Sequence, residues 1–82
     1  MRKLELGHAY HTDDGINVAP VKILPNNRAV FVTDDFEHVP YVIWYYHLSD
    51  DDADENLIYL YNGRPYASLI EVLTVVREEE SE

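Results

Sequence analysis

The chain has 82 residues, of which 46% are hydrophobic, and its 16 acidic residues outweigh 6 basic ones to give a formal net charge of −10. This length predicts one domain, and the hydrophobic fraction is too high for intrinsic disorder. The negative charge argues against direct binding to nucleic acid or to an anionic membrane, since both need basic patches.

The first two predicted strands are separated by a glycine turn. Leu4–Thr12 is predicted as a strand, with Gly7 as a bulge or a point of close approach. Asp13–Gly15 is a turn in which the glycine supplies a positive φ. Ile16–Leu24 is the second strand, and because Pro20 removes a ladder donor we place this strand at an edge or expect a break there.

The middle of the chain predicts two further strands. Pro25–Asn27 is a turn, and Arg28–Thr33 follows as the third strand. Asp34–Glu37 is a loop or a single helical turn. Val39–Leu48 is dominated by β-branched and aromatic residues and is the strongest predicted strand, followed by a solvated acidic loop at Ser49–Asn56.

The last third of the chain carries two conflicting patterns. Leu57–Tyr61 is a fifth strand, and Asn62–Gly63 is the dipeptide typical of a tight hairpin turn. The β-branched run that follows favours a helical turn at Tyr66–Ile70 and then a strand at Glu71–Arg77. The alternative is a full C-terminal helix, because Ser68–Glu71 matches a capping box.

These elements predict a mainly β fold. We expect a compact antiparallel sheet of five or six strands, bent or closed as an SH3-like barrel, with one short C-terminal helical segment. A five-stranded sheet backed by one C-terminal helix is the alternative. Residues 1–77 would form the single small β domain and residues 78–82 an acidic, frayed tail.

The location expected for this chain is the cytoplasm. It has no cysteine, so disulfides, thiolate chemistry and Cys-ligated zinc are excluded. Its first residues show no signal-peptide pattern, and its longest apolar run, within Val39–Tyr46, is far shorter than a membrane span.

The acidic residues gather on both sides of the strongest strand. Between Arg28 and Arg64 the chain has no lysine or arginine but eight acids: Asp34, Asp35, Glu37, Asp50, Asp51, Asp52, Asp54 and Glu55. A ten-residue strand is about 33 Å long, so the two groups should lie at opposite ends of it.

The acidic loop permits three interpretations. Alternate residues in Asp50–Asn56 copy the spacing of an EF-hand calcium loop, but Glu55 stands where that loop needs glycine and Tyr61 where it needs glutamate, so we predict no metal. A solvated loop and a contact surface for a protein partner remain. If extended, alternate acids would lie about 6.6–6.8 Å apart, whereas B-DNA advances about 3.4 Å per phosphate along each strand, so such a row could present a phosphate-like pattern.

The histidines and serines do not form a recognisable catalytic set. His8 and His11 would point to opposite faces of a strand, as would His38 and His47, so we interpret them as ordinary surface or turn residues. Of the three serines, none sits in a strand-to-helix elbow, and the glycines form no phosphate-binding loop. We therefore predict no enzymatic activity and no cofactor.

The strongest strand is aromatic on both faces. One face would carry Tyr41, Tyr45 and His47 with Val39 and Ile43, and the other Val42, Trp44, Tyr46 and Leu48. A small barrel buries only its inner face, so loops or the C-terminal segment cover the second row, or it is an aromatic contact surface. A homodimer through that row is equally compatible.

Both ends of the chain resemble small phage accessory proteins. Gly7–Gly15 is similar to their G-x-x-Y-x-T-x-D-G opening, and Tyr61–Arg64 with Leu69–Val72 to their closing strand, turn and Leu-rich segment. Size and acidity also resemble phage-encoded inhibitors that imitate DNA, such as anti-CRISPR proteins and uracil-DNA glycosylase inhibitors, and Asp54–Leu57 is similar to a stretch of the latter. This resemblance implies a DNA-mimic inhibitor acting in a host cytoplasm.

The sequence thus favours a non-enzymatic acidic protein that inhibits a basic nucleic-acid-binding protein by partial DNA mimicry. The two acidic groups would supply the electrostatics, and exposed residues among Tyr41, Trp44, Tyr45 and Tyr46 the anchors. The alternative is a structural or assembly module that self-associates through its aromatic strand.

Overall fold

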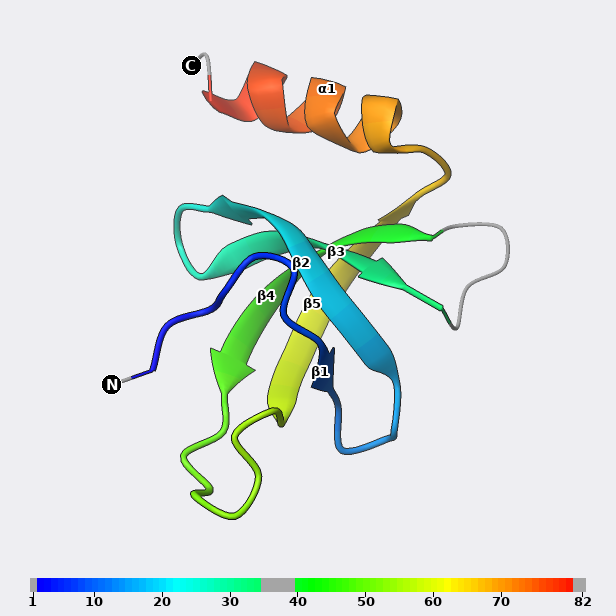
Figure 1. Cartoon of the computed structure of the whole chain (residues 1–82). Helices are drawn as coiled ribbons and strands as arrows, with labels where there is room; N and C mark the ends of the chain where they lie inside the picture. The colour runs from blue at the N-terminus through cyan, green and yellow to red at the C-terminus, as the bar shows by residue number, and fades with distance from the viewer. Residues whose placement is uncertain (1, 35–39, 81–82) are drawn as a thin grey trace.

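The computed structural model of the chain describes residues 2–34 and 40–80. It contains five strands and one helix: β1 (Tyr10–His11), β2 (Asn17–Leu24), β3 (Arg28–Thr33), β4 (Tyr41–Leu48), β5 (Ile58–Tyr66) and α1 (Leu69–Glu80). The strands form one antiparallel sheet in chain order, β1 to β5 (Figure 1). The mainly β prediction with a C-terminal helical segment is confirmed. Within the described residues, no helix is long and apolar enough to cross a membrane.

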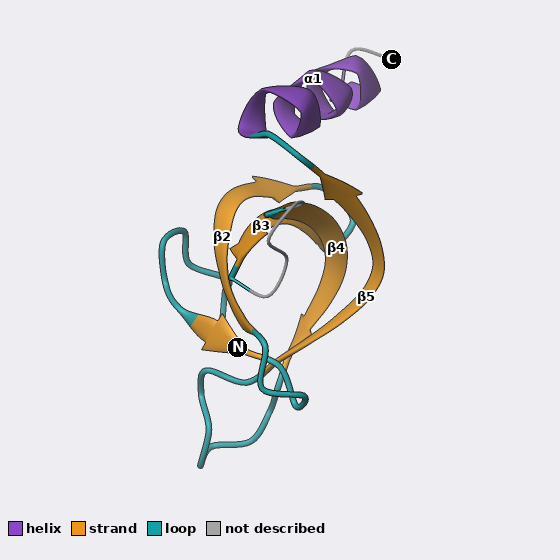
Figure 2. Ribbon diagram, turned by 90° about the vertical axis from the view of Figure 1, so that its right-hand side faces the viewer, coloured by secondary structure: helices purple, strands orange, loops and turns teal. Residues whose placement is uncertain are grey.

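The sheet curls into a half-barrel because its first and last strands meet at one end (Figure 2). His11 forms a parallel bridge with Leu57, and its backbone N–H donates to the Asn56 carbonyl at 2.9 Å. Elsewhere the strands follow each other as a simple meander. The short first strand therefore closes a sheet that would otherwise end openly at β5.

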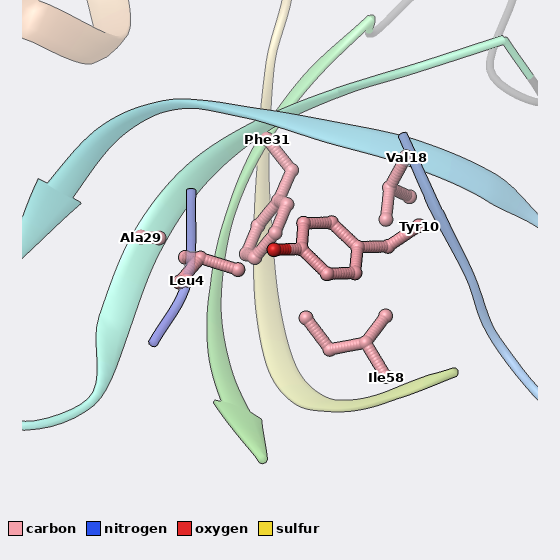
Figure 3. Close-up of a cluster of buried hydrophobic side chains, with 6 residues drawn as sticks. All are labelled: Leu4, Tyr10, Val18, Ala29, Phe31 and Ile58. Atoms are coloured by element: carbon pink, nitrogen blue, oxygen red, sulfur yellow. The ribbon is translucent and has the colours of Figure 1, made fainter. Parts of the chain in front are cut away.

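The inner face of the half-barrel holds the main core. In Figure 3 the rings of Tyr10 and Phe31 point toward one another. The Tyr10 hydroxyl accepts a bond from the Glu5 backbone N–H at 3.1 Å, so its polar end is satisfied although the residue is buried. The cluster of buried residues is Leu4, Tyr10, Val18, Ala29, Phe31 and Ile58.

A second cluster lies on the outer face of the sheet, under α1. Val72 and Val76, one helical turn apart, pack with the strand residues Leu24, Val30 and Ile43. Figure 1 shows α1 at the end of the molecule opposite to the loop between β4 and β5. The helix covers one part of the outer face and leaves the part near that loop uncovered.

Several predicted boundaries are confirmed. β3 has the predicted bounds, and β4 begins at Tyr41 within the predicted range, whose residue 39 lies outside the described residues. The asparagine turn forms with both Asn26 and Asn27 at positive φ, 63° and 57°. The break expected at Pro20 occurs as an irregular register between Pro20 and Lys22.

The prediction of a long first strand at Leu4–Thr12 was wrong. Only Tyr10–His11 is extended and paired, because Gly7 turns the chain with a φ of 77°. Its N–H donates to the Pro20 carbonyl at 3.1 Å, which fixes the turn against β2. On a strand, Leu4 and Leu6 would share one face. Leu4 is buried but Leu6 is exposed, and neither residue belongs to a strand.

The predicted hairpin turn at Asn62–Gly63 was also wrong. β5 continues through both residues to Tyr66, and they form a β-bulge in which two residues oppose Trp44 alone. Asn62 takes the left-handed conformation at φ 54°, which asparagine tolerates. Gly63 is required because a Cβ there would overlap the Trp44 indole.

The predicted C-terminal strand is a helix. Its first turn is capped by the Ser68 hydroxyl, which accepts a bond from the Glu71 N–H at 3.2 Å. The helix runs to Glu80, so residues 78–80, which we expected to fray, are helical; residues 81–82 lie outside the described part. Burial of Val72 and Val76 offsets the weak helix propensity of the β-branched residues.

Gly63→Ala should lower the free energy of unfolding by about 1–3 kcal/mol, because the added methyl group overpacks the contact with Trp44. Urea unfolding measures this change. In a Trp44→Leu background the same substitution should cost less than about 1 kcal/mol, since residues in contact are energetically coupled. An equal cost in both backgrounds would contradict the steric explanation.

Candidate functional site

The acidic loop, Ser49–Asn56, lies between β4 and β5 and contains two successive turns. The Asp54 N–H donates to the Asp51 carbonyl at 3.1 Å, and the Leu57 N–H donates to the Asp54 carbonyl at 3.4 Å. The loop is therefore folded rather than extended. The phosphate-like spacing of alternate acids applied only to an extended segment, so that geometric argument does not hold.

Two histidines fasten the loop to the N-terminal segment. The His11 Nε2–H donates to Asp54 Oδ2 at 2.6 Å, and the His8 Nε2–H donates to Asn56 Oδ1 at 2.7 Å. Both reach the same loop because the segment before Tyr10 is not a strand and does not alternate. The expectation that these histidines point to opposite faces was wrong.

An arginine completes this attachment. The Arg2 guanidinium donates to the Glu55 backbone carbonyl. We call Arg2, His8 and His11 the N-terminal clasp. All three contacts join residues more than 40 positions apart in the chain. No local pattern in the sequence indicates these contacts, because they depend on closure of the half-barrel.

The clasp leaves most loop carboxylates facing solvent. Asp50, Asp51, Asp52 and Glu55 are exposed, whereas Asp54 is partly buried against His11. Within residues 2–34 and 40–80, none of these four exposed carboxylates forms an ion pair. The loop thus presents an ordered group of unneutralised negative charges.

Asp34, the described member of the other predicted acidic group, lies at the far end of β4. Asp34 is exposed just after β3, and the Thr33 N–H donates to the Pro40 carbonyl at 2.9 Å, which places this end beside the start of β4. Asp35 and Glu37 lie outside the described residues. An eight-residue strand spans about 26 Å, so Asp34 and the acidic loop are well separated.

The structure distributes the four predicted aromatic anchors over three environments. Trp44 and Tyr46 pack against the inner cluster, with ring centroids 6.0 and 6.2 Å from that of Phe31. Tyr41 packs against the outer cluster under α1. Tyr45 is partly exposed on the outer face. Of the predicted anchors, Tyr45 is therefore the one best placed to contact a partner.

Two tyrosines of β5 extend the exposed aromatic surface. Tyr61 is 50% exposed and stacks on Tyr45 with ring centroids 5.6 Å apart, while Tyr59 is 40% exposed and stacks on His47 at 6.3 Å. We call Tyr45, His47, Tyr59 and Tyr61 the aromatic ladder. In the sequence, Tyr59 and Tyr61 alternate with Ile58 and Leu60, which indicates that the two tyrosines share one face of a strand. The alternation does not indicate which face is exposed.

A further acidic group borders the ladder at the helix end. The Arg28 guanidinium pairs with Glu79 at 2.8 Å, which brings the last turn of α1, Glu78–Glu80, over β3. Arg28 is the register partner of Tyr45, so this turn lies beside the ladder. The ladder therefore lies between two negative groups, the acidic loop and the end of α1.

A hollow of about 950 Å³ opens at the end of the half-barrel beside the acidic loop. Its lining combines apolar Leu4, Ile23 and Leu48 with Arg2, Lys3 and three acids of the loop, Asp50, Asp52 and Glu55. Within the described residues, no three histidine, aspartate or glutamate side chains gather as a metal-binding group.

The serine in this hollow has a structural partner. Ser49 is buried, and its Oγ accepts a bond from the Asp51 backbone N–H at 3.1 Å, which caps the first loop turn. The Ser68 hydroxyl is likewise engaged at the start of α1. Both hydroxyls thus have a local role in holding a turn.

Comparison of the chain with models of protein families, with curated proteins and with solved structures finds no match. The resemblance to phage-encoded inhibitors therefore stays a prediction.

His11→Leu should loosen the acidic loop without unfolding the domain, because it removes a partly exposed hydrogen bond worth about 0.5–1 kcal/mol. We expect amide hydrogen exchange within the acidic loop to accelerate about two- to fivefold, as that energy implies. In an Asp54→Asn background the substitution should have a smaller effect. Unchanged exchange in the His11→Leu variant would show that the clasp does not order the loop.

Proposed function

We propose that this chain is a non-enzymatic acidic binding protein that occupies the basic surface of a nucleic-acid-binding protein and so inhibits it by partial DNA mimicry. The observation that carries this proposal is the acidic loop, whose exposed carboxylates lack ion pairs among the described residues and are held in place by the N-terminal clasp. A fixed cluster of charge loses less conformational freedom on binding than a disordered acidic tail.

The overall charge supports a basic partner. With a formal net charge of −10, the chain attracts cationic surfaces at long range, and such steering accelerates association when the salt concentration is low. A protein surface that binds nucleic acid carries the required lysine and arginine side chains. Direct nucleic-acid binding by this chain is disfavoured by the same charge.

The mimicry we propose is one of charge rather than of phosphate spacing. The loop is folded into turns, so it does not reproduce a regular row of phosphates. It presents several carboxylates close together, and the end of α1 adds Glu78–Glu80 on the other side of the aromatic ladder. A basic groove would meet negative charge at two places with aromatic surface between them. A phage-encoded inhibitor of the anti-CRISPR or uracil-DNA glycosylase inhibitor type, acting in a host cytoplasm, fits this description.

Self-association is the second candidate, and the exposed tyrosines of β5 favour it. Tyr59 and Tyr61 lie on the last strand of the sheet, where a second copy could pack. The negative charge on both sides of the ladder opposes the approach of two copies. The partner surface that we favour is therefore a cationic one.

Light scattering distinguishes the two candidates. For the inhibitor we expect a monomer at both low and high salt, because like charges repel at low salt and the exposed tyrosines offer too little surface to hold a dimer once salt screens that repulsion. A dimer that persists in both conditions and is broken by Tyr45→Arg would support self-association instead.

Replacing Asp50, Asp51 and Asp52 by Asn should slow association with the partner at least about tenfold at low salt, since steering depends on these charges. The partner is sought among proteins that the immobilised chain retains at low salt and releases at high salt, each tested for displacement from double-stranded DNA by this chain. Surface plasmon resonance then gives the association rates.

The matched control changes three exposed acids elsewhere, Asp13→Asn, Asp14→Asn and Glu71→Gln, and removes the same charge. We expect it to alter the rate by no more than about twofold. Equal rates for the loop variant and the unaltered chain would remove the loop from the mechanism, and a partner that stays on its DNA would contradict inhibition by mimicry.

A further inference from the structure

A row of side chains crosses the outer face from β3 to β5. Arg28 pairs in register with Tyr45, and Tyr45 pairs in register with Tyr61. The two tyrosine rings are nearly parallel, with an interplanar angle of 20°. Because β5 is the last strand, the row ends at Tyr61, which is half exposed.

The neighbouring pair repeats this arrangement toward the acidic loop. His47 and Tyr59 stack at an interplanar angle of 24°, and both are exposed. Apart from the bridge at Leu57, no strand in the described part of the chain pairs with the free edge of β5. The rings of Tyr59 and Tyr61 thus form the border of an uncovered surface where the next strand of a sheet would lie.

At its inner end, on β3 and β4, the row pairs an arginine with an aromatic residue. Arg28 is the cross-strand neighbour of Tyr45, and its guanidinium binds Glu79 at 2.8 Å, so an arginine held by a carboxylate stands next to an aromatic residue in the register of this face. At the outer end, Tyr61 supplies the ring but has no cation as its next cross-strand neighbour, and the acidic loop supplies carboxylates beyond Tyr59. Arg64, the basic residue of β5, lies past the β-bulge, opposite Ile43.

We propose that the aromatic ladder binds an arginine side chain of the basic partner, with its guanidinium stacked on the open ring of Tyr61 or Tyr59. This inference rests on the proposed function and adds a preference for arginine over lysine. A guanidinium is planar and weakly hydrated, so it stacks on an aromatic ring more readily than a compact ammonium group does. A second copy of the chain is a poorer occupant, because its acidic groups would meet those that flank the ladder.

The test uses oligoarginine and oligolysine peptides of eight residues, which carry equal side-chain charge, titrated into the full chain by isothermal calorimetry. Both should bind more weakly as salt rises, and octa-arginine should bind at least about threefold more tightly than octa-lysine. The variant with Tyr59→Leu and Tyr61→Leu should lose this preference and keep its affinity for octa-lysine. The corresponding Phe substitutions, which retain the rings, should keep the preference.

Ile70→Ala is the matched control, since Ile70 is an exposed apolar residue on α1 outside the ladder. It should leave the arginine preference unchanged. Equal affinities for the two peptides, or a preference that survives in the double Leu variant, would overturn the ladder as an arginine site while leaving the proposed function standing. If neither peptide binds at low salt, both the arginine site and the proposed function are overturned. The variant in which Asp50, Asp51 and Asp52 are replaced by Asn should lose affinity for the two peptides by the same factor.

Discussion

The contact between the N-terminal segment and the end of the acidic loop is the constraint on which the rest of the structure depends. The backbone bond from His11 to Asn56 and the bridge to Leu57 draw the first strand against the last. This closure brings Tyr10 over the inner cluster next to Ile58, and both are buried as a result. It also sets the position of the loop, because the side chain of His11, a residue of β1, binds the loop residue Asp54. Core formation and presentation of the carboxylates therefore share one set of contacts.

The few basic residues are used in a way that keeps the surface negative. Arg2 binds the Glu55 carbonyl and Arg28 binds Glu79, so both of these cations are engaged within the chain. Neither neutralises a carboxylate of the acidic loop. Arg2 holds the acidic loop through the backbone carbonyl of Glu55. Arg28 holds the end of α1 through the carboxylate of Glu79. The acidic loop keeps exposed carboxylates without ion pairs among the described residues, whereas at the helix end Glu79 is paired with Arg28.

Sequence patterns predicted those features that depend on neighbouring residues. The β-branched and aromatic residues of Arg28–Thr33 and the turn preference of asparagine act over a few positions, and the strand and the turn predicted from them are both confirmed. The features that were missed depend on distant partners. Asn62–Gly63 forms a bulge because Trp44 lies across from it, and the segment after Ser68 is helical because its valines find the outer cluster. The same is true of the site: the composition indicated an acidic loop, but the clasp, the exposed ring faces and the acidic helix end appear only when the sheet is assembled.

The separation of the clasp residues from their partners has a consequence for how the domain folds and opens. The meander from β2 to β5 is made of contacts between strands adjacent in the chain, which form at low entropic cost, whereas the His11–Leu57 bridge must close a long segment. Residues 2–11 therefore join the sheet late, and their opening removes Leu4 and Tyr10 from the inner cluster, so it weakens the core as well as releasing the loop. A ligand that binds only the ordered loop shifts this opening equilibrium toward the closed form, so binding at the acidic end protects the N-terminal segment by thermodynamic linkage.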